Sequence, residues 1–183
     1  IMNLSEKKDA DILRGDLPNV RSMYCARPGY VIVHADYSQQ ELRVMEAVAS
    51  DDALATALAC GDVYSYDAKE WFELPDSYEA IKKEKKEIRK ACKMGHLASQ
   101  YGAGLFARHA QMLMQDLNFQ YDMTRRIARQ FERTYHRTVS YWDEEQKRVE
   151  ACGYSEGRIL GGRLYYPAMP DRSKTANFPI QRT

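Results

Sequence analysis

Four consecutive apolar residues, Tyr30 to Val33, lead into a carboxylate at Asp36. An unbroken apolar run of this length is typical of a strand that is buried on both faces, so we predict a strand over residues 30–36. A carboxylate at the end of such a strand is costly to remove from water unless a cation or hydrogen bonds compensate it. Asp36 is therefore a candidate metal ligand, and the alternative is an Asp that only caps the next helix.

Most of the chain after this run has the apolar spacing of helices, with turn residues between them. The predicted helices cover residues 40–49, 50–61, 62–72, 78–100, 105–117 and 124–152, the last with a break near Thr138. Residues 154–160 and 163–167 flank Gly161-Gly162 and predict a β-hairpin. The expected fold class is α+β and predominantly helical, with a small β frame around a large helical insertion.

Composition excludes several classes of protein. The net charge is only +1, so no field over the whole molecule favours a polyanionic partner. The four cysteines form no CxxC pair, which indicates reduced thiols and neither a zinc site nor a disulfide framework. No apolar run approaches the length of a membrane span, and the first residues lack the apolar core of a signal peptide. We expect a soluble intracellular protein with no membrane partner.

Charge is nevertheless concentrated locally. Residues 79–93 hold seven basic and three acidic side chains. Arg89, Lys93 and Leu97 follow one another at i+4, so they spread over an arc of about 80° on one helix face. Two cations on that arc can bind a polyanion such as a triphosphate. The alternative is a solvated basic face that nearby glutamates balance.

Five segments, in order along the chain, resemble motifs of the family A DNA polymerases. Asp36-Tyr37-Ser38-Gln39-Gln40-Glu41-Leu42-Arg43 is similar to motif A, and RKACKMGHLASQYG at 89–102 has the spacing of motif B, R-x3-K-x3-[F/Y]-G-x2-YG. GDVYSYDA resembles the [K/G]-D-I-H segment, GYSEGRILGGRLYYP the G-R-R hairpin, and NFPIQRT the N-x-P-[I/M]-Q-G-T element. The resemblance covers the chain from about Asp16 to Thr183.

The resemblance implies template-directed addition of dNTPs to a primer 3′ end with two Mg²⁺ ions. Asp36 would be one of the two carboxylates that hold the metal pair, and the Tyr37 backbone carbonyl would assist. Arg89 and Lys93 would bind the triphosphate, and Lys93 would also be the candidate proton donor to pyrophosphate. The remaining dNTP-binding residues implied by the motifs are Gln39, Glu41 as the steric gate against a ribose 2′-hydroxyl, Tyr64, Leu97, and Tyr101 near the templating base.

Primer–template DNA is the second partner that the resemblance implies. Arg21, Arg43, Asn177 and Gln181 would contact its backbone or minor groove. Alternatives from the residues alone are an ion pair for Arg43, a turn role for Asn177, core packing for Tyr101 and support of a helix N-terminus for Glu41.

The chain departs from the family pattern at several motif positions. Leu97 occupies the aromatic position of motif B, and His96 and Ala98 replace the usual Asn and Gly. Tyr64 stands where the family has a His, and Arg182 replaces the Gly of Q-G-T. Leu97 puts sugar discrimination and rate in doubt. Tyr64 keeps a hydroxyl donor but cannot become a cation.

The 183 residues contain no His-Asp-Glu triplet of the motif C type, which supplies the second metal carboxylate in the family. We therefore expect a polymerase that is incomplete, and weak or inactive alone. Motif C would come from a second chain, lie beyond the sequence, or be lost. The expected division is a first palm segment over 1–60, fingers over 61–140, and a returning palm segment over 141–183. The expected location is the cytoplasm of a bacterial cell or, for a phage protein, of its host.

Two other functions stay open at this stage. One is a non-catalytic nucleotide- or DNA-binding module derived from a polymerase, which would use the basic helix and aromatic residues without chemistry. The other is a structural helical protein in which the motifs are remnants.

Overall fold

The computed structural model describes residues 24–114, 117, 120–157 and 161–181. The chain divides into two compact units, Ile1–Ser38 and Gln39–Thr183. In the first unit, residues 24–38 contain neither helix nor strand, so the strand predicted over 30–36 is wrong. Tyr30 to Val33 have exposed fractions between 56% and 84%. An apolar run forms a strand only where another strand accepts its backbone hydrogen bonds, and no described residue does so here.

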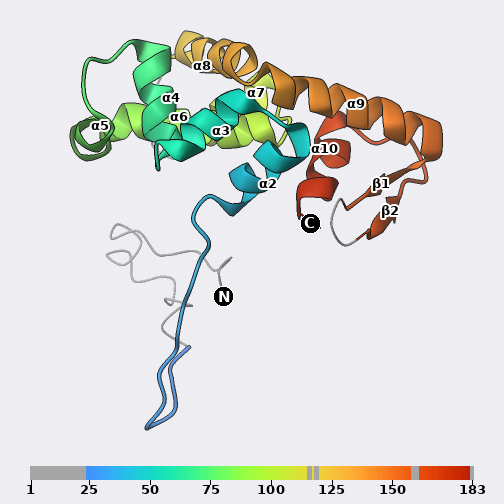
Figure 1. Cartoon of the computed structure of the whole chain (residues 1–183), viewed down its shortest axis with the longest axis horizontal. Coiled ribbons are helices and arrows are strands. Elements are labelled where there is room, and N and C mark those ends of the chain that lie inside the picture. The colour runs from blue at the N-terminus through green and yellow to red at the C-terminus, as the bar shows by residue number, and fades with distance from the viewer. Residues whose placement is uncertain (1–23, 115–116, 118–119, 158–160, 182–183) are drawn as a thin grey trace. The chain divides into compact units, whose positions relative to one another are not determined.

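The second unit is mostly helical, which confirms the expected fold class (Figure 1). In chain order its elements are α2 (Gln40–Ala49), α3 (Asp52–Ala59), α4 (Val63–Phe72), α5 (Tyr78–Glu84), α6 (Lys86–Gln100), α7 (Leu105–Met114), α8 (Tyr121–Thr134), α9 (His136–Cys152), β1 (Tyr154–Glu156), β2 (Arg163–Tyr165) and α10 (Arg172–Gln181). Among the described residues, no helix is both long and apolar enough to cross a membrane.

Helix α6 lies at the centre of one group of helices and packs against α4, α5, α7 and α8. Gly95 of α6 allows α8 to come close, because a Cβ at this position would lie 2.3 Å from Cγ2 of Ile127. Trp71, Ile127 and Phe131 are fully buried in the core of this group.

A second group consists of α2, α9, α10 and β1, which pack on one another. Asp51 connects α9 of this group to the start of α3. Its Oδ1 accepts from the backbone N–H groups of Ala53 and Leu54 at the start of α3. Its Oδ2 accepts from both the backbone N–H and the hydroxyl of Thr138 in α9, each at 2.8 Å. A buried carboxylate with four hydrogen bonds fixes the start of α3 against α9.

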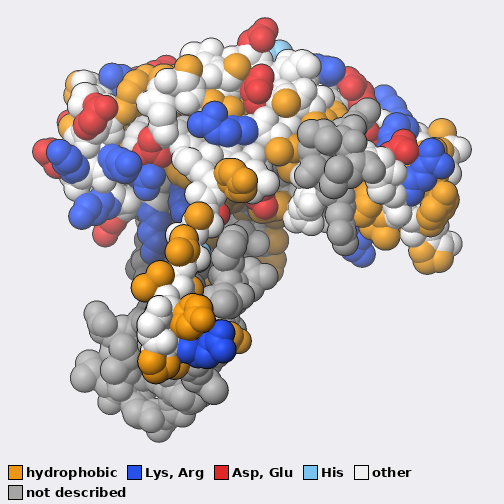
Figure 2. All heavy atoms as spheres, turned by 60° about the horizontal axis from the view of Figure 1, so that its bottom comes forward, with side chains coloured by type: hydrophobic (Ala, Val, Ile, Leu, Met, Phe, Trp, Pro, Cys, Tyr) orange, Lys and Arg blue, Asp and Glu red, His pale blue; other side chains and the backbone are white. Residues whose placement is uncertain are grey.

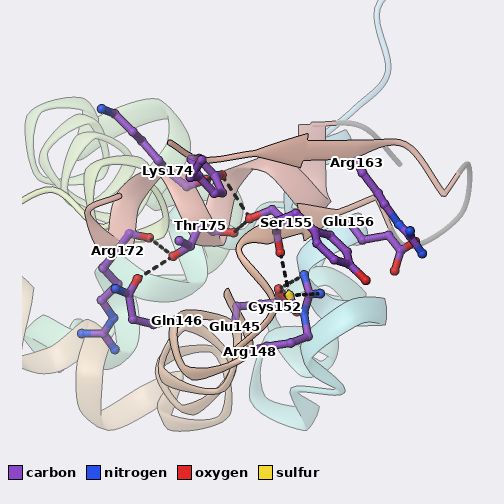
Figure 3. A network of polar contacts seen from close by, with 12 residues as sticks. Glu145, Gln146, Arg148, Cys152, Ser155, Glu156, Arg163, Arg172, Lys174 and Thr175 are labelled. Carbon is purple, nitrogen blue, oxygen red and sulfur yellow. Dashed lines mark hydrogen bonds and ion pairs between the residues drawn. The ribbon is translucent and has the colours of Figure 1, made fainter. Parts of the chain in front are cut away.

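The predicted hairpin is present, although its strands are shorter than expected. β1 and β2 pair antiparallel, with Tyr154 opposite Tyr165. Polar contacts join the hairpin and α10 to α9 (Figure 3). The Thr175 hydroxyl donates to Gln146 at 2.9 Å, and the Ser155 hydroxyl donates to the Thr175 carbonyl at 3.5 Å. These contacts hold α10 in place.

Two helix predictions need correction, and one helix was not predicted. The helix expected over 78–100 is divided at Lys85 into α5 and α6, and the helix expected over 124–152 is divided at Tyr135, three residues before the expected position near Thr138. Residues 172–181 form α10, which was not predicted because Pro179 interrupts the helical pattern. Buried Ala176 and Ile180 show that tertiary packing stabilises this helix.

Candidate functional site

The basic face predicted on α6 is present and lies against Tyr64 of α4. The Arg89 guanidinium and the Lys93 ammonium each lie 5.7 Å from the centre of the Tyr64 ring. Lys93 is exposed, whereas Tyr64 is 8% exposed. Burial raises the pKa of Tyr64 to about 12, so its hydroxyl stays protonated at neutral pH and can donate to an anion.

Arg89 has a carboxylate partner that its own helix did not reveal. Its Nε and Nη2 donate to the two oxygens of Asp62, at 2.7 and 2.9 Å. Burial acts to raise the pKa of Asp62, but the Arg89 guanidinium and the Ser65 hydroxyl outweigh it and lower that pKa. A bidentate pair holds the guanidinium in one orientation beside Tyr64. Arg89 is therefore paired, although its own helix has no acidic residue at i+4.

Exposed lysines extend the basic character beyond this face. Lys82, Lys83, Lys85 and Lys86 are all exposed at the junction of α5 and α6. Figure 2 shows Lys and Arg side chains gathered where α5 lies, with acidic side chains among them.

Three predicted residues from distant parts of the sequence meet at the end of α6. The Tyr101 hydroxyl donates to Oε2 of Glu41 in α2, and Asn177 of α10 donates through Nδ2 to the Tyr101 carbonyl at 3.4 Å. Gly102 has a φ of 66°, and a Cβ there would lie 3.2 Å from Cα of Ser173. Glycine is thus required for the close approach of α10 to this turn. Burial, with Glu41 as the next cause, raises the pKa of Tyr101.

Asn177 lines two hollows in the surface beside this junction. One hollow is lined by residues that include Tyr101, Gly102 and Asn177, and the other by residues that include Asn177 and Gln181. Oδ1 of Asn177 is buried without a hydrogen-bond partner among the described residues. Asn177 lies within a helix, so the turn alternative is wrong.

The sequence interpretation missed a buried polar cluster behind the basic face. Nδ1 of His96 lies 2.6 Å from Oδ2 of Asp67, and the Tyr135 hydroxyl donates to Oδ1 of the same carboxylate. All three side chains are at most 1% exposed. Burial, with the Asp67 charge as the next cause, raises the pKa of Tyr135, and burial also raises the pKa of Asp67. The only sequence signal was His96 itself, which departs from the family pattern.

The remaining predicted residues are distributed as follows. Gln39 donates through Nε2 to the Gly61 carbonyl at 3.0 Å, Arg43 is exposed on α2, and Leu97 is half-buried on α6 between Lys93 and Tyr101. Asp36 and Tyr37 are exposed residues of the first unit. Arg21 and Arg182 lie outside the described residues.

A carboxylate such as Asp36 is a ligand type that Mg²⁺ prefers. In the described part of the chain, no group of three or more metal-ligating side chains comes together. Asp36 therefore fits one ligand position of a magnesium site and not a complete site. The four cysteines, all in the described part of the chain, form no disulfide with one another.

Comparison with known proteins identifies what this arrangement resembles. Residues 11–183 match the model of DNA polymerase family A. The chain is 28% identical to DNA polymerase I of Pseudomonas aeruginosa over 90% of its own length and 17% of that protein. It is 25% identical to the thermostable DNA polymerase I of Thermus aquaticus, over 90% of its own length and 20% of that protein. The chain thus spans about a fifth of the length of these relatives.

A solved structure with the same fold is the POL domain of Pol1 from M. smegmatis, in complex with DNA primer-template and dNTP. The TM-score is 0.69 at 21% identity, over 99% of this chain and 31% of that one. The ordered motifs, the shared fold and the match over nearly all of the sequence lead to one conclusion. The chain belongs to DNA polymerase family A.

Proposed function

We propose that this chain binds a dNTP along the face that runs from Arg89 and Lys93 to Tyr101 and Glu41, as part of a template-directed DNA polymerase. The observation that carries the proposal is the continuity of that face. Arg89, Lys93, Leu97 and Tyr101 lie at successive i+4 positions, about 18 Å from first to last along α6. Membership of family A supports DNA synthesis as the reaction of the whole protein.

In this proposal the cationic end of the face binds the triphosphate. Lys93 is exposed and can move, whereas Asp62 orients the Arg89 guanidinium and Tyr64 adds a hydroxyl donor. Lys93 can also donate a proton to the pyrophosphate oxygen as the leaving group departs. Because a triphosphate is a stronger anion than one carboxylate, it can compete with Asp62 for Arg89.

The other end of the face would contact the sugar and the base. The Tyr101 hydroxyl donates to the Glu41 carboxylate, and this carboxylate would exclude a ribose 2′-hydroxyl. Leu97 would pack on the sugar from the middle of the face. Asn177 and Gln181 line hollows beside Tyr101 and would contact primer–template DNA, together with Arg21 and Arg43.

Asp36 would hold magnesium through its carboxylate, and Tyr37 would assist through its backbone carbonyl. When bound, the magnesium pair would activate the primer 3′-hydroxyl and neutralise charge on the leaving pyrophosphate. One carboxylate does not complete such a site, so a second must come from another part of the protein or another chain. We infer that the 183 residues alone are weak or inactive in synthesis. Residues 1–60 and 141–183 would belong to the palm and 61–140 to the fingers.

Asp36→Asn tests the metal part of this proposal. We expect the variant to bind dTTP about tenfold more weakly than the wild type in Mg²⁺, because one charge-assisted metal ligand is lost. Without divalent cation, the two proteins should bind dTTP equally. Isothermal titration calorimetry with and without Mg²⁺ measures both affinities.

Asp76→Asn, an equal change in the turn between α4 and α5, serves as the control and should bind like the wild type. If Asp36→Asn leaves Mg²⁺-dependent binding intact while Lys93→Ala removes binding, the chain is a non-catalytic nucleotide-binding module. Absence of any affinity for dTTP in the wild type would reject both functions.

A further inference from the structure

Helix α8 carries a second basic surface, separate from the proposed dNTP site. Arg125, Arg129 and Arg133 follow one another at i+4, about 6 Å apart along the helix axis, and Arg126 lies beside them. All four are exposed, and they spread over an arc of about 100°. The buried residues of α8, which include Ile127 and Phe131, lie on the opposite side. We call these four arginines the α8 arginine surface.

Arg129 and Arg133 are available to a ligand, whereas Arg125 and Arg126 already have partners. Arg125 lies 3.4 Å from Asp122, and Arg126 donates to the Trp71 carbonyl at 3.0 Å while its guanidinium lies 4.7 Å from the Phe72 ring centre. For Arg129 and Arg133, by contrast, no described carboxylate lies within ion-pair distance.

Neither of the two acidic residues that border the surface pairs with Arg129 or Arg133, since Asp122 lies beside Arg125. Glu132 lies at its edge, and Arg108 of α7 approaches Glu132 at 4.0 Å. The four arginines and two acids, Asp122 and Glu132, line one open hollow on this side of the helix. The hollow therefore keeps an excess of positive charge.

The chemistry of this surface fits a phosphate backbone. Guanidinium groups bind phosphate through two parallel hydrogen bonds, and a row of them at a regular spacing suits an anion that repeats along a strand. Tyr121, 38% exposed, lies next to the row, with its ring centre 5.4 Å from the Arg125 guanidinium. An exposed aromatic ring beside a basic row is the combination that binds unpaired bases and their backbone.

We propose that the α8 arginine surface binds single-stranded nucleic acid, through the phosphates to Arg129 and Arg133 and through a base to Tyr121. The choice of nucleic acid as the ligand rests on the proposed function, in which the chain acts on a template strand. Ile127, on the opposite side of α8, packs on Gly95 of α6, so the α8 arginine surface is distinct from the face of Arg89 and Lys93. It would hold the template outside the site of dNTP binding.

The test measures how salt changes the affinity for a fluorescent oligothymidylate of about 20 nucleotides, by fluorescence anisotropy. The plot of log K against log[salt] has a slope of about −0.7 for each phosphate that a single-strand binder neutralises. Arg129→Gln should make the slope less steep by about 0.7, and Arg129→Gln/Arg133→Gln by about 1.4. Tyr121→Ala should weaken binding several-fold with little change in slope.

Arg137→Gln is the matched control, because Arg137 is a partly exposed arginine of α9 that is paired with Glu144 at 2.6 Å. It makes the same change in net charge and should leave the slope as in the wild type. Equal slopes for Arg129→Gln and Arg137→Gln would overturn the proposal. The proposal would also be overturned if Arg129→Gln lost binding to poly-L-glutamate but kept binding to oligothymidylate. In that case the surface would bind an acidic peptide.

The dTTP affinity separates this inference from the proposed function. Arg129→Gln should bind dTTP as the wild type does, because Arg129 lies on another helix. A normal dTTP response with unchanged DNA binding rejects the α8 arginine surface and leaves the dNTP site standing. If Arg129→Gln changes the DNA slope but no dTTP binding is seen, the α8 arginine surface stands and the dNTP site is rejected.

Discussion

Asp67→Ala is expected to lower the free energy of unfolding by about 3–5 kcal/mol, because it leaves two buried groups without their partner. His96 would lose its contact with the carboxylate at 2.6 Å, and the Tyr135 hydroxyl would lose its acceptor. Neither side chain can reach water from its buried position. Urea unfolding followed by tryptophan fluorescence measures the change, since Trp71 stacks near His96.

Two further variants show how much of that loss of stability comes from the buried cluster. Tyr135→Phe removes one hydrogen bond and should cost about 1–2 kcal/mol. Asp76→Ala makes the same substitution outside the buried cluster and should change stability by less than about 0.5 kcal/mol. If Asp67→Ala costs no more than Asp76→Ala, the cluster does not hold α4, α6 and the junction of α8 and α9 together.

Lys93→Ala is expected to weaken dTTP binding about 30-fold, since it removes a charged contact to the triphosphate worth about 2 kcal/mol. Lys93 is an exposed residue, so stability should stay within about 0.5 kcal/mol of the wild type. Calorimetric titration with dTTP and urea unfolding measure the two effects. Arg89→Ala is a poorer test, because it would leave the partly buried Asp62 without its partner.

Lys147→Ala supplies the control for this prediction. Lys147 is an exposed lysine of α9, and its removal changes the net charge by the same amount. It should bind dTTP like the wild type. An equal loss in the two variants would mean that net charge, and not the α6 face, governs binding.

Much of the helical fold could be predicted because local apolar spacing determines it. Helix α2 begins and ends at the predicted residues, and its buried residues include Leu42 and Met45, as the spacing requires. The strand over 30–36 was wrong because an apolar run does not show whether a neighbouring strand exists. Helix α10 was missed because contacts such as Thr175 to Gln146, far apart in sequence, stabilise it.

The motifs named several residues that lie together in the structure, but the sequence did not show their contacts. Glu41, Tyr101 and Asn177 were identified by motif, and the structure brings them together. The partner of Arg89 was missed because Asp62 lies 27 residues away, where helix spacing gives no information. The Asp67–His96 pair is likewise 29 residues apart and becomes visible only when α4 packs on α6.

The central claim is that the α6 face recognises a triphosphate, and the most direct test compares dTTP, dTDP and dTMP in Mg²⁺ by calorimetry. The account predicts that affinity rises with each phosphate, that dTTP binds at least about tenfold more tightly than dTMP, and that Lys93→Ala reduces this ratio. Equal affinities for dTTP and dTMP in the wild type, or an unchanged ratio in Lys93→Ala, would contradict it.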